Sequence, residues 1–193
     1  AAAANAAAEC RRLIGDEWIL GEGEISLAAC ILDLLRTRGQ TLAVAESCTG
    51  GLLGSMLTDI AGSSDAFLGG WITYANAMKT AQLGVSPDIL ATHGAVSRAC
   101  AEAMARGALR SSGASHALAI TGIAGPGGGT DAKPVGTVWI ALASTEAPVV
   151  ARRFLLVGDR GNIRSWAAQS GLGMLRLRLI GREDIALMRQ AEA

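Results

Sequence analysis

The chain has 193 residues, of which 50% are hydrophobic, so it can bury one sizeable core and is more simply organised as one compact domain than as two. Its 17 basic and 17 acidic side chains cancel, which argues against a surface built for nucleic acid or an anionic membrane, although it leaves room for a local basic patch. No apolar run reaches the length of a membrane span. We therefore expect no nucleic-acid partner and no membrane partner.

The first eight residues, AAAANAAA, have neither the basic leading region nor the strongly apolar core of a signal peptide. We therefore expect the first eight residues to be artefactual and residues 10–23 to be a connector, so that residues 1–23 form an artefactual or linker segment. Residues 24–182 carry the patterned helices and strands and should form the domain. Residues 183–193 should be a C-terminal tail.

The cysteines and histidines are too scattered to form a metal site. None of Cys10, Cys30, Cys48 and Cys100 has CxxC spacing, and neither histidine has a Cys or His neighbour at ligand distance. We expect no metal, no cofactor and no disulfide framework, which fits a reducing cytoplasm. Cys48 lies beside Ser47, but no histidine is nearby in the sequence to hold a thiolate, so we expect a small packed side chain.

Helical spacing of apolar residues alternates with short apolar or β-branched runs along residues 24–182. Gly39 and Gly181 lie where glycines commonly end helices, and Asn76 and Asp159 are expected to cap the helices that follow them. In chain order the patterns predict helix 24–38, strand 41–45, helix 52–60, strand 67–74, helix 76–83, helix 97–109, strand 116–121, strands 136–143 and 149–156, and helix 160–180.

The last two predicted strands are separated only by STEAP, a link of hairpin length, so they must be antiparallel if they pair. The earlier strands alternate with helices, which is typical of parallel pairing. The sequence therefore predicts an α/β protein, a three-layer α/β/α sandwich around a mixed sheet of about five strands.

The stretch TLAVAESCTGGLL, residues 41–53, is predicted to form a strand, a tight turn and the start of a helix. The first N–H groups of a helix are unpaired and lie at the positive end of its dipole, where developing oxyanions are stabilised. Ser47 is therefore a candidate nucleophile, and Thr49, Gly50 and Gly51 are candidates for its oxyanion region. The alternative is that Thr49 is only an N-cap and Ser47 only a turn residue.

The segment TYANAMK, residues 73–79, places Tyr74 at a strand end and Lys79 in the first turn of the next helix. The helix dipole disfavours a cation there, so the lysine is either solvated or needed in its neutral form. A neutral Lys79 near Ser47 would be a general base, as in serine–lysine variants of the catalytic triad, and Tyr74 could donate to the oxyanion or relay a proton. The alternative is a surface lysine beside a core tyrosine.

Two further segments have features of an anion site. The loop 122–129 contains glycines, Gly122 and Gly125 among them, that let the backbone approach a ligand closely, but it matches neither the P-loop nor the dinucleotide fingerprint. It is either a phosphate or ribose cradle or a flexible connector. The segment GDRGNIR puts Arg160 and Arg164 in the first turns of a helix, where one of them could bind an anionic ligand. The alternative, a solvated helix face, applies to Arg164 more than to Arg160.

Several of these motifs occur together and in one order: AESCTGG, ITYANAMK, LGV, HGAVS, TGIAGPGGGTDAKPVGTVWIA and GDR. Over roughly residues 24–180 they resemble the C-terminal domain of the CinA competence/damage-inducible family, the nicotinamide mononucleotide deamidases. The resemblance implies hydrolysis of the carboxamide of nicotinamide mononucleotide to the acid mononucleotide and ammonia, without a metal. GDEWILGEGEISL also resembles the connector that follows a molybdopterin-binding-like domain in fused members of the family.

Carried onto this chain, the resemblance implies that Ser47 is the nucleophile, Lys79 the base and Tyr74 a supporting hydroxyl. It also implies an oxyanion region bordered by Thr49, Gly50 and Gly51, and substrate contacts from Asn76, Thr121 and Arg160, to which we add Gly122 and Gly125. The expected partners are a small-molecule nucleotide and further copies of the chain, with a dimer favoured. The competing hypothesis is a non-catalytic nucleotide-binding module in which the glycine loop and Arg160 hold a phosphate while Ser47 and Lys79 are structural.

Overall fold

The protein is built around one twisted sheet of six strands, in the order β2-β1-β3-β4-β5-β6. The structure, a computed structural model, describes residues 2–191. β1 pairs in parallel with both β2 and β3, and the remaining neighbours are antiparallel. The strands are β1 Leu42–Glu46, β2 Phe67–Ile72, β3 His116–Gly122, β4 Thr137–Ser144, β5 Val150–Leu155 and β6 Gln190–Ala191.

The predicted α/β sandwich with a mixed sheet is confirmed, with six strands in place of about five. The additional strand is β6, which pairs its two residues with the edge of β5. It lies in the segment that we expected to be a C-terminal tail, of which residues 192 and 193 lie outside the described part. The predicted hairpin of β4 and β5 is antiparallel, as its short link requires.

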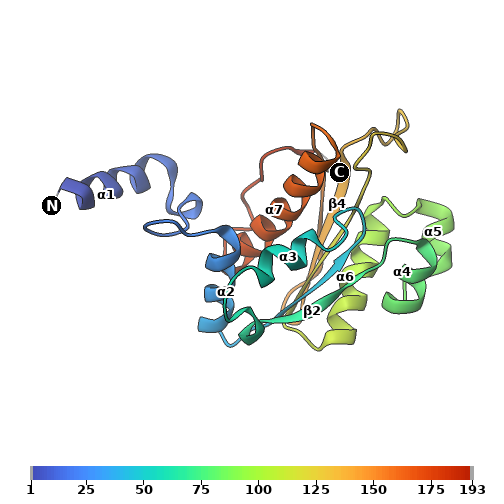
Figure 1. Cartoon of the computed structure of the whole chain (residues 1–193), viewed down its shortest axis with the longest axis horizontal. Coiled ribbons are helices and arrows are strands. Elements are labelled where there is room, and N and C mark those ends of the chain that lie inside the picture. The colour runs from blue at the N-terminus through green and yellow to red at the C-terminus, as the bar shows by residue number, and fades with distance from the viewer. Residues whose placement is uncertain (1, 192–193) are drawn as a thin grey trace.

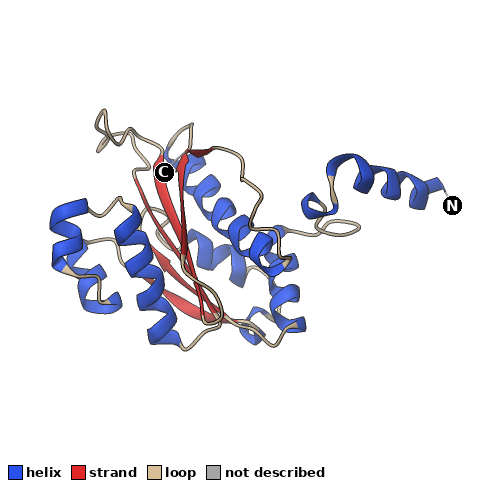
Figure 2. Ribbon diagram, turned by 180° about the vertical axis from the view of Figure 1, so that it is seen from behind, coloured by secondary structure: helices blue, strands red, loops and turns tan. Residues whose placement is uncertain are grey.

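Helices cover both faces of the sheet, as Figure 2 shows with the strands between two helical layers. Apolar side chains of β1 alternate between the layers: Leu42 and Val44 pack in one cluster, and Ala45 in the other. The first layer contains α2 Leu27–Thr37, α3 Leu52–Thr58 and α7 Arg160–Leu179, and the second contains α4 Asn76–Leu83, α5 Pro87–His93 and α6 Arg98–Ser112.

Side-chain caps begin several of these helices where the sequence supplies them. Ser97 accepts from the N–H of Cys100 at 3.2 Å, and Asp159 accepts from the N–H of Asn162 at 2.8 Å. The predicted capping role of Asn76 is wrong, because Ala75 occupies the cap position and Asn76 is the first helical residue. Asn76 is therefore available to face solvent, and Lys79 still lies in the first turns of α4.

Both ends of the chain are fastened near the C-terminal half of α7. Within the segment expected to be a linker, the structure has a helix, α1 Ala2–Ile14, which projects away from the sandwich, and a short 3₁₀ turn, Asp16–Trp18 (Figure 1). Arg176 of α7 donates to the carbonyls of Glu17 and Ile19, and Arg152 of β5 donates to carbonyls of the C-terminal segment. Among the described helices, none is long and apolar enough to cross a membrane.

Candidate functional site

Ser47 lies directly after β1, at the carboxyl end of the parallel part of the sheet. Its backbone N–H donates to the carbonyl of Ile120 on β3 at 3.0 Å, and the carbonyl of Glu46 accepts from the N–H of Thr73 beyond β2 at 2.8 Å. The backbone of the serine is thus held on both sides. The side chain is only 8% exposed, in the region where open α/β sheets place their ligand sites.

Lys79 reaches Ser47 from the second helical layer. Its Nζ lies 3.1 Å from Ser47 Oγ, 2.8 Å from the carbonyl oxygen of Thr73 and 3.1 Å from that of Tyr74. The side chain is 1% exposed, and burial lowers the pKa of the ammonium below its ordinary value because it disfavours the charged form. The two residues that the sequence proposed as nucleophile and base are therefore adjacent.

The three acceptors around Lys79 suit both of its protonation states. A neutral amine has two N–H groups, which the carbonyls of Thr73 and Tyr74 can accept, and one lone pair, which can accept the Ser47 hydroxyl proton. An ammonium has three N–H groups for the same three oxygens. A proton can therefore move between Ser47 Oγ and Lys79 Nζ without leaving either group unpaired.

The carboxylate of Glu46 binds the amides at the N-terminus of α3, which we expected to face the serine. Because successive strand residues point to opposite faces, Glu46 is directed to the first layer and Ser47 to the second. The Glu46 carboxylate accepts from the N–H groups of Gly51, Leu53 and Gly54 at 3.0, 3.1 and 2.8 Å. The first amides of α3 are therefore taken by this carboxylate, on the side of the sheet away from Lys79.

Two other amides remain for an oxyanion. The N–H of Gly50 donates to the carbonyl of Ser47 at 3.1 Å. The N–H groups of Cys48 and Thr49, in contrast, bond to no other residue in the part of the chain that is described. They directly follow the serine, as the amides of an oxyanion hole commonly do.

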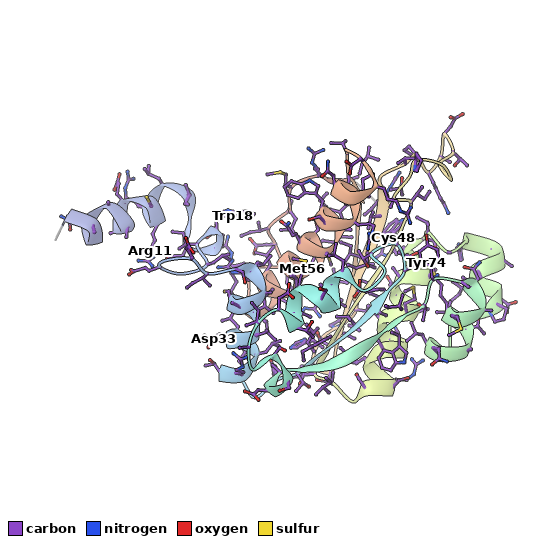
Figure 3. All side chains as sticks on the ribbon, viewed as in Figure 1. Arg11, Trp18, Asp33, Cys48, Met56 and Tyr74 are labelled. Carbon is purple, nitrogen blue, oxygen red and sulfur yellow. The ribbon has the colours of Figure 1, made fainter. Side chains whose placement is uncertain are left out.

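A cavity of about 220 Å³ opens above Ser47. Figure 3 shows Cys48 and Tyr74 close together at this end of the sheet, and both line the cavity. Of the proposed site residues, the structure brings into its wall Ser47, Tyr74, Lys79, Thr121, Gly122 and Arg160. Thr49, Gly50 and Gly51 lie in the turn behind the serine, and Asn76 is exposed and does not line the cavity.

Arg160 links two other proposed residues, Gly125 and Tyr74, at the rim. Its Nη1 donates to the carbonyl of Gly125 at 2.8 Å and its Nη2 donates to the Tyr74 hydroxyl at 3.0 Å. The Tyr74 side chain is 61% exposed, so its hydroxyl lies with the arginine at the rim. Deeper in the wall, the Thr121 hydroxyl donates to the carbonyl of Ala95 at 2.9 Å.

Two neighbours of Ser47, Glu46 and Arg164, have roles that the residue types alone did not reveal, and a third, Cys48, has the packed role that the sequence predicted. Glu46 binds the amides of α3, and Arg164 donates to the carbonyl of Thr49 from Nη2 at 2.7 Å and from Nε at 3.2 Å. Strand alternation was the one available signal for Glu46. Cys48 is buried, and burial raises the pKa of its thiol to about 12, so it stays protonated as a packed side chain. Within residues 2–191, no group of three or more His, Cys, Asp or Glu side chains is placed to hold a metal ion.

Comparison with known proteins gives one consistent answer. A family model described as the CinA C-terminal domain matches residues 24–179. The CinA-like protein of Myxococcus xanthus is 48% identical over 93% of this chain and 42% of its own length, and that of Gemmatimonas aurantiaca is 52% identical over 89% and 40%. The chain thus spans about two fifths of the length of these curated relatives.

Solved structures match the same region. The competence/damage inducible protein CihA from Agrobacterium tumefaciens is 44% identical with a TM-score of 0.76, covering 80% of this chain and 93% of that one. A CinA superfamily protein from Klebsiella pneumoniae is 35% identical with a TM-score of 0.77, covering 80% and 96%. The α/β/α sandwich described above is the fold that these proteins share with the chain.

Proposed function

The chain belongs to the CinA family, whose C-terminal domain it contains, and from this premise we propose that it is a nicotinamide-nucleotide amidase. It would hydrolyse nicotinamide mononucleotide to nicotinate mononucleotide and ammonia. The observation that carries the chemistry is the buried contact of 3.1 Å between Lys79 Nζ and Ser47 Oγ. The substrate rests on the resemblance of the motifs around these two residues.

In the first half of the reaction, neutral Lys79 takes the hydroxyl proton of Ser47 while Oγ attacks the carboxamide carbon. The carboxamide oxygen becomes an oxyanion, for which the N–H groups of Cys48 and Thr49 are the proposed donors. Lys79 then gives its proton to the amide nitrogen as the C–N bond breaks. Ammonia leaves, and the nicotinoyl group remains on Ser47 as an ester.

In the second half, a water molecule replaces ammonia. Lys79 accepts a proton from the water as its oxygen attacks the ester carbon, and it returns that proton to Ser47 Oγ as the ester bond breaks. The product is the carboxylic acid of the nucleotide, and the enzyme is restored. Every proton in this sequence passes through the Nζ that already contacts Ser47.

The cavity is of a size to enclose only part of this substrate. At about 220 Å³ it is smaller than the roughly 300 Å³ at which pockets for complete drug-sized ligands begin. We therefore propose that the nicotinamide ring enters the cavity, while the ribose and phosphate extend along the rim toward Arg160 and Gly125. Tyr74 would support the site from there, because its hydroxyl is paired with Arg160.

Release of ammonia tests the proposal directly. Purified protein should produce ammonia and nicotinate mononucleotide from nicotinamide mononucleotide, with and without a chelator, while Ser47→Ala should not. The non-catalytic alternative predicts that the nucleotide binds to the wild-type chain and that no ammonia appears. Binding without turnover in the wild type would therefore reject the amidase and favour the binding module.

We also propose that the chain acts in the cytoplasm and as a homo-oligomer, with a dimer favoured. Support for association comes from edge strand β2, which pairs only with β1 among the described strands and leaves Leu68 and Ile72 51% and 58% exposed. Apolar edges of this kind tend to be covered by another chain. Light scattering of the purified protein would give the oligomeric state.

A further inference from the structure

We propose that Glu46 and Arg164 are positioning residues that together clamp the Ser47 turn, residues 47–50, Glu46 through the amides that follow the turn and Arg164 through a carbonyl within it. The inference rests on the proposed function, because it assigns these side chains to the geometry of the serine and its oxyanion donors. Neither side chain is among those that line the cavity. Each acts instead through the backbone that follows Ser47.

Glu46 is suited to this role by its burial and its partners. Its side chain is 1% exposed, and its two carboxylate oxygens accept the three N–H groups of Gly51, Leu53 and Gly54. A buried carboxylate is costly unless it is hydrogen-bonded, so these bonds hold α3 firmly against the end of β1. Because Glu46 and Ser47 are consecutive in the chain, a shift of the Glu46 backbone also moves Ser47.

The turn needs such support because its own backbone is permissive. Gly50 and Gly51 have φ values of +59° and +94°, in the left-handed region that glycine enters readily. Without external contacts, two adjacent glycines allow the turn several conformations. A rigid orientation of the Cys48 and Thr49 amides therefore depends on groups outside the turn.

Arg164 supplies the second contact, from α7. The peptide unit between Thr49 and Gly50 is held at both ends, since Arg164 donates to its carbonyl oxygen at 2.7 and 3.2 Å and its N–H donates to the carbonyl of Ser47 at 3.1 Å. This unit directly follows the amides of Cys48 and Thr49. Arg164 thus holds the segment that carries the nucleophile and the proposed oxyanion donors at the carbonyl of Thr49, and Glu46 holds the amides that follow that segment.

The clamp predicts a distinctive kinetic defect. Misplacing a reacting group by about 1 Å can cost about 100-fold in rate. The other residues of the cavity wall, among them Thr121, Gly122 and Arg160, lie outside the turn. The lysine retains its contacts with the carbonyls of Thr73 and Tyr74, which lie outside the turn. Loss of the clamp should therefore lower kcat while KM and the pH at which activity rises stay close to those of the wild type.

Glu46→Gln and Arg164→Met in the full chain test this. Matched controls are Glu102→Gln and Arg106→Met, which break an ion pair of 3.1 Å on α6. We expect kcat to fall about 10- to 100-fold in both clamp variants, KM to change less than about threefold, and the controls to resemble the wild type. A folded clamp variant with wild-type kcat, or one in which only KM or the pH midpoint moves, would overturn the inference. Should Glu46→Gln not fold, Arg164→Met decides it.

A substrate-independent measurement separates this inference from the proposed function. If the wild type releases no ammonia, the amidase proposal fails, and the clamp is then judged by the rate at which a fluorophosphonate probe labels Ser47, located by mass spectrometry. Slower labelling in both clamp variants than in their controls supports the clamp. Equal rates, or no labelling of Ser47 in the wild type, overturn it.

Discussion

Two cavities of this protein each have a buried basic side chain in their wall, and the two side chains differ in what they can do. In the site cavity, Lys79 donates to the backbone carbonyls of Thr73 and Tyr74. In a second cavity of about 340 Å³, between the N-terminal connector, α7 and the C-terminal segment, Arg176 donates to those of Glu17 and Ile19. Figure 3 shows Trp18, which lines the second cavity, far from Tyr74.

Lys79 differs from Arg176 in having a hydroxyl group as a further hydrogen-bond partner. Lys79 also contacts the Ser47 hydroxyl, and burial lowers its pKa, so it can exchange a proton with the serine. An arginine keeps its proton, and Arg176 only holds the connector in place. The proposed chemistry is therefore assigned to the smaller and less apolar of the two cavities, because a proton acceptor beside a hydroxyl is a more direct sign of a reactive site than volume.

The largest effects should come from removing the pair that distinguishes the site cavity. Ser47→Ala and Lys79→Ala should each lower ammonia release by on the order of 10³-fold or more, and the double variant should be little worse than either, because the two act as one unit. Steady-state kinetics on all three variants measures this. If Lys79→Ala kept kcat and raised only KM, the lysine would be a binding group and the comparison would fail.

Lys79→Arg sharpens the comparison by giving the site cavity a cation like that of the other cavity. We expect this variant to be inactive at every pH, since arginine cannot accept the serine proton. In the wild type, kcat/KM should rise with pH through the lowered pKa of Lys79 and be lost below it, where the ammonium cannot act as a base. A flat pH profile in the wild type would contradict the role of the lysine.

The same pKa shift predicts how stability responds to pH. Because the folded pKa of Lys79 lies below its ordinary value of 10.5, the unfolded chain binds more protons between these two pKa values. The contribution of Lys79 to the free energy of unfolding should therefore rise with pH over that interval. Denaturation of wild type and Lys79→Met at several pH values would measure the difference in slope.

Arg160→Ala tests the rim of the site cavity and should have an intermediate effect. If Arg160 contacts the substrate phosphate, the variant should bind nicotinamide mononucleotide about 10- to 100-fold more weakly, as expected for the loss of a charge-assisted hydrogen bond. Nicotinamide riboside, which lacks the phosphate, should lose little. Equal losses for both ligands in calorimetric titrations would reject the phosphate contact.

The smallest effect on turnover should come from the cation of the second cavity. Arg176→Met removes the bonds to Glu17 and Ile19, so the free energy of unfolding should fall by about 1–3 kcal/mol while kcat stays within about twofold. Thermal denaturation and the ammonia assay measure the two quantities, with exposed Arg110→Met as the control. A loss of turnover equal to that of Lys79→Ala would show that the two cavities are not independent.

Most of the fold followed from local patterns. Residues close together in the sequence determine the positions of strands β1 to β5 and the antiparallel hairpin of β4 and β5. They also determine the glycines and the aspartate at the ends of helices. β6 could not be predicted, because a strand of two residues has no periodicity. Its pairing with β5 depends on the fastening of the C-terminal segment by Arg152, a contact between residues far apart in the chain.

The sequence by itself determined which groups could carry the chemistry, since a serine after a strand and a lysine at the start of a helix are local features. Only the tertiary structure brings Ser47 Oγ and Lys79 Nζ, from residues 32 positions apart, to a distance of 3.1 Å. It also directed the Glu46 carboxylate to the α3 amides and left Asn76 exposed. The physical reason is that strand alternation gives each side chain a face, but the pairing of β1 with β2 and the packing of α3 and α4 on opposite faces decide what it meets there.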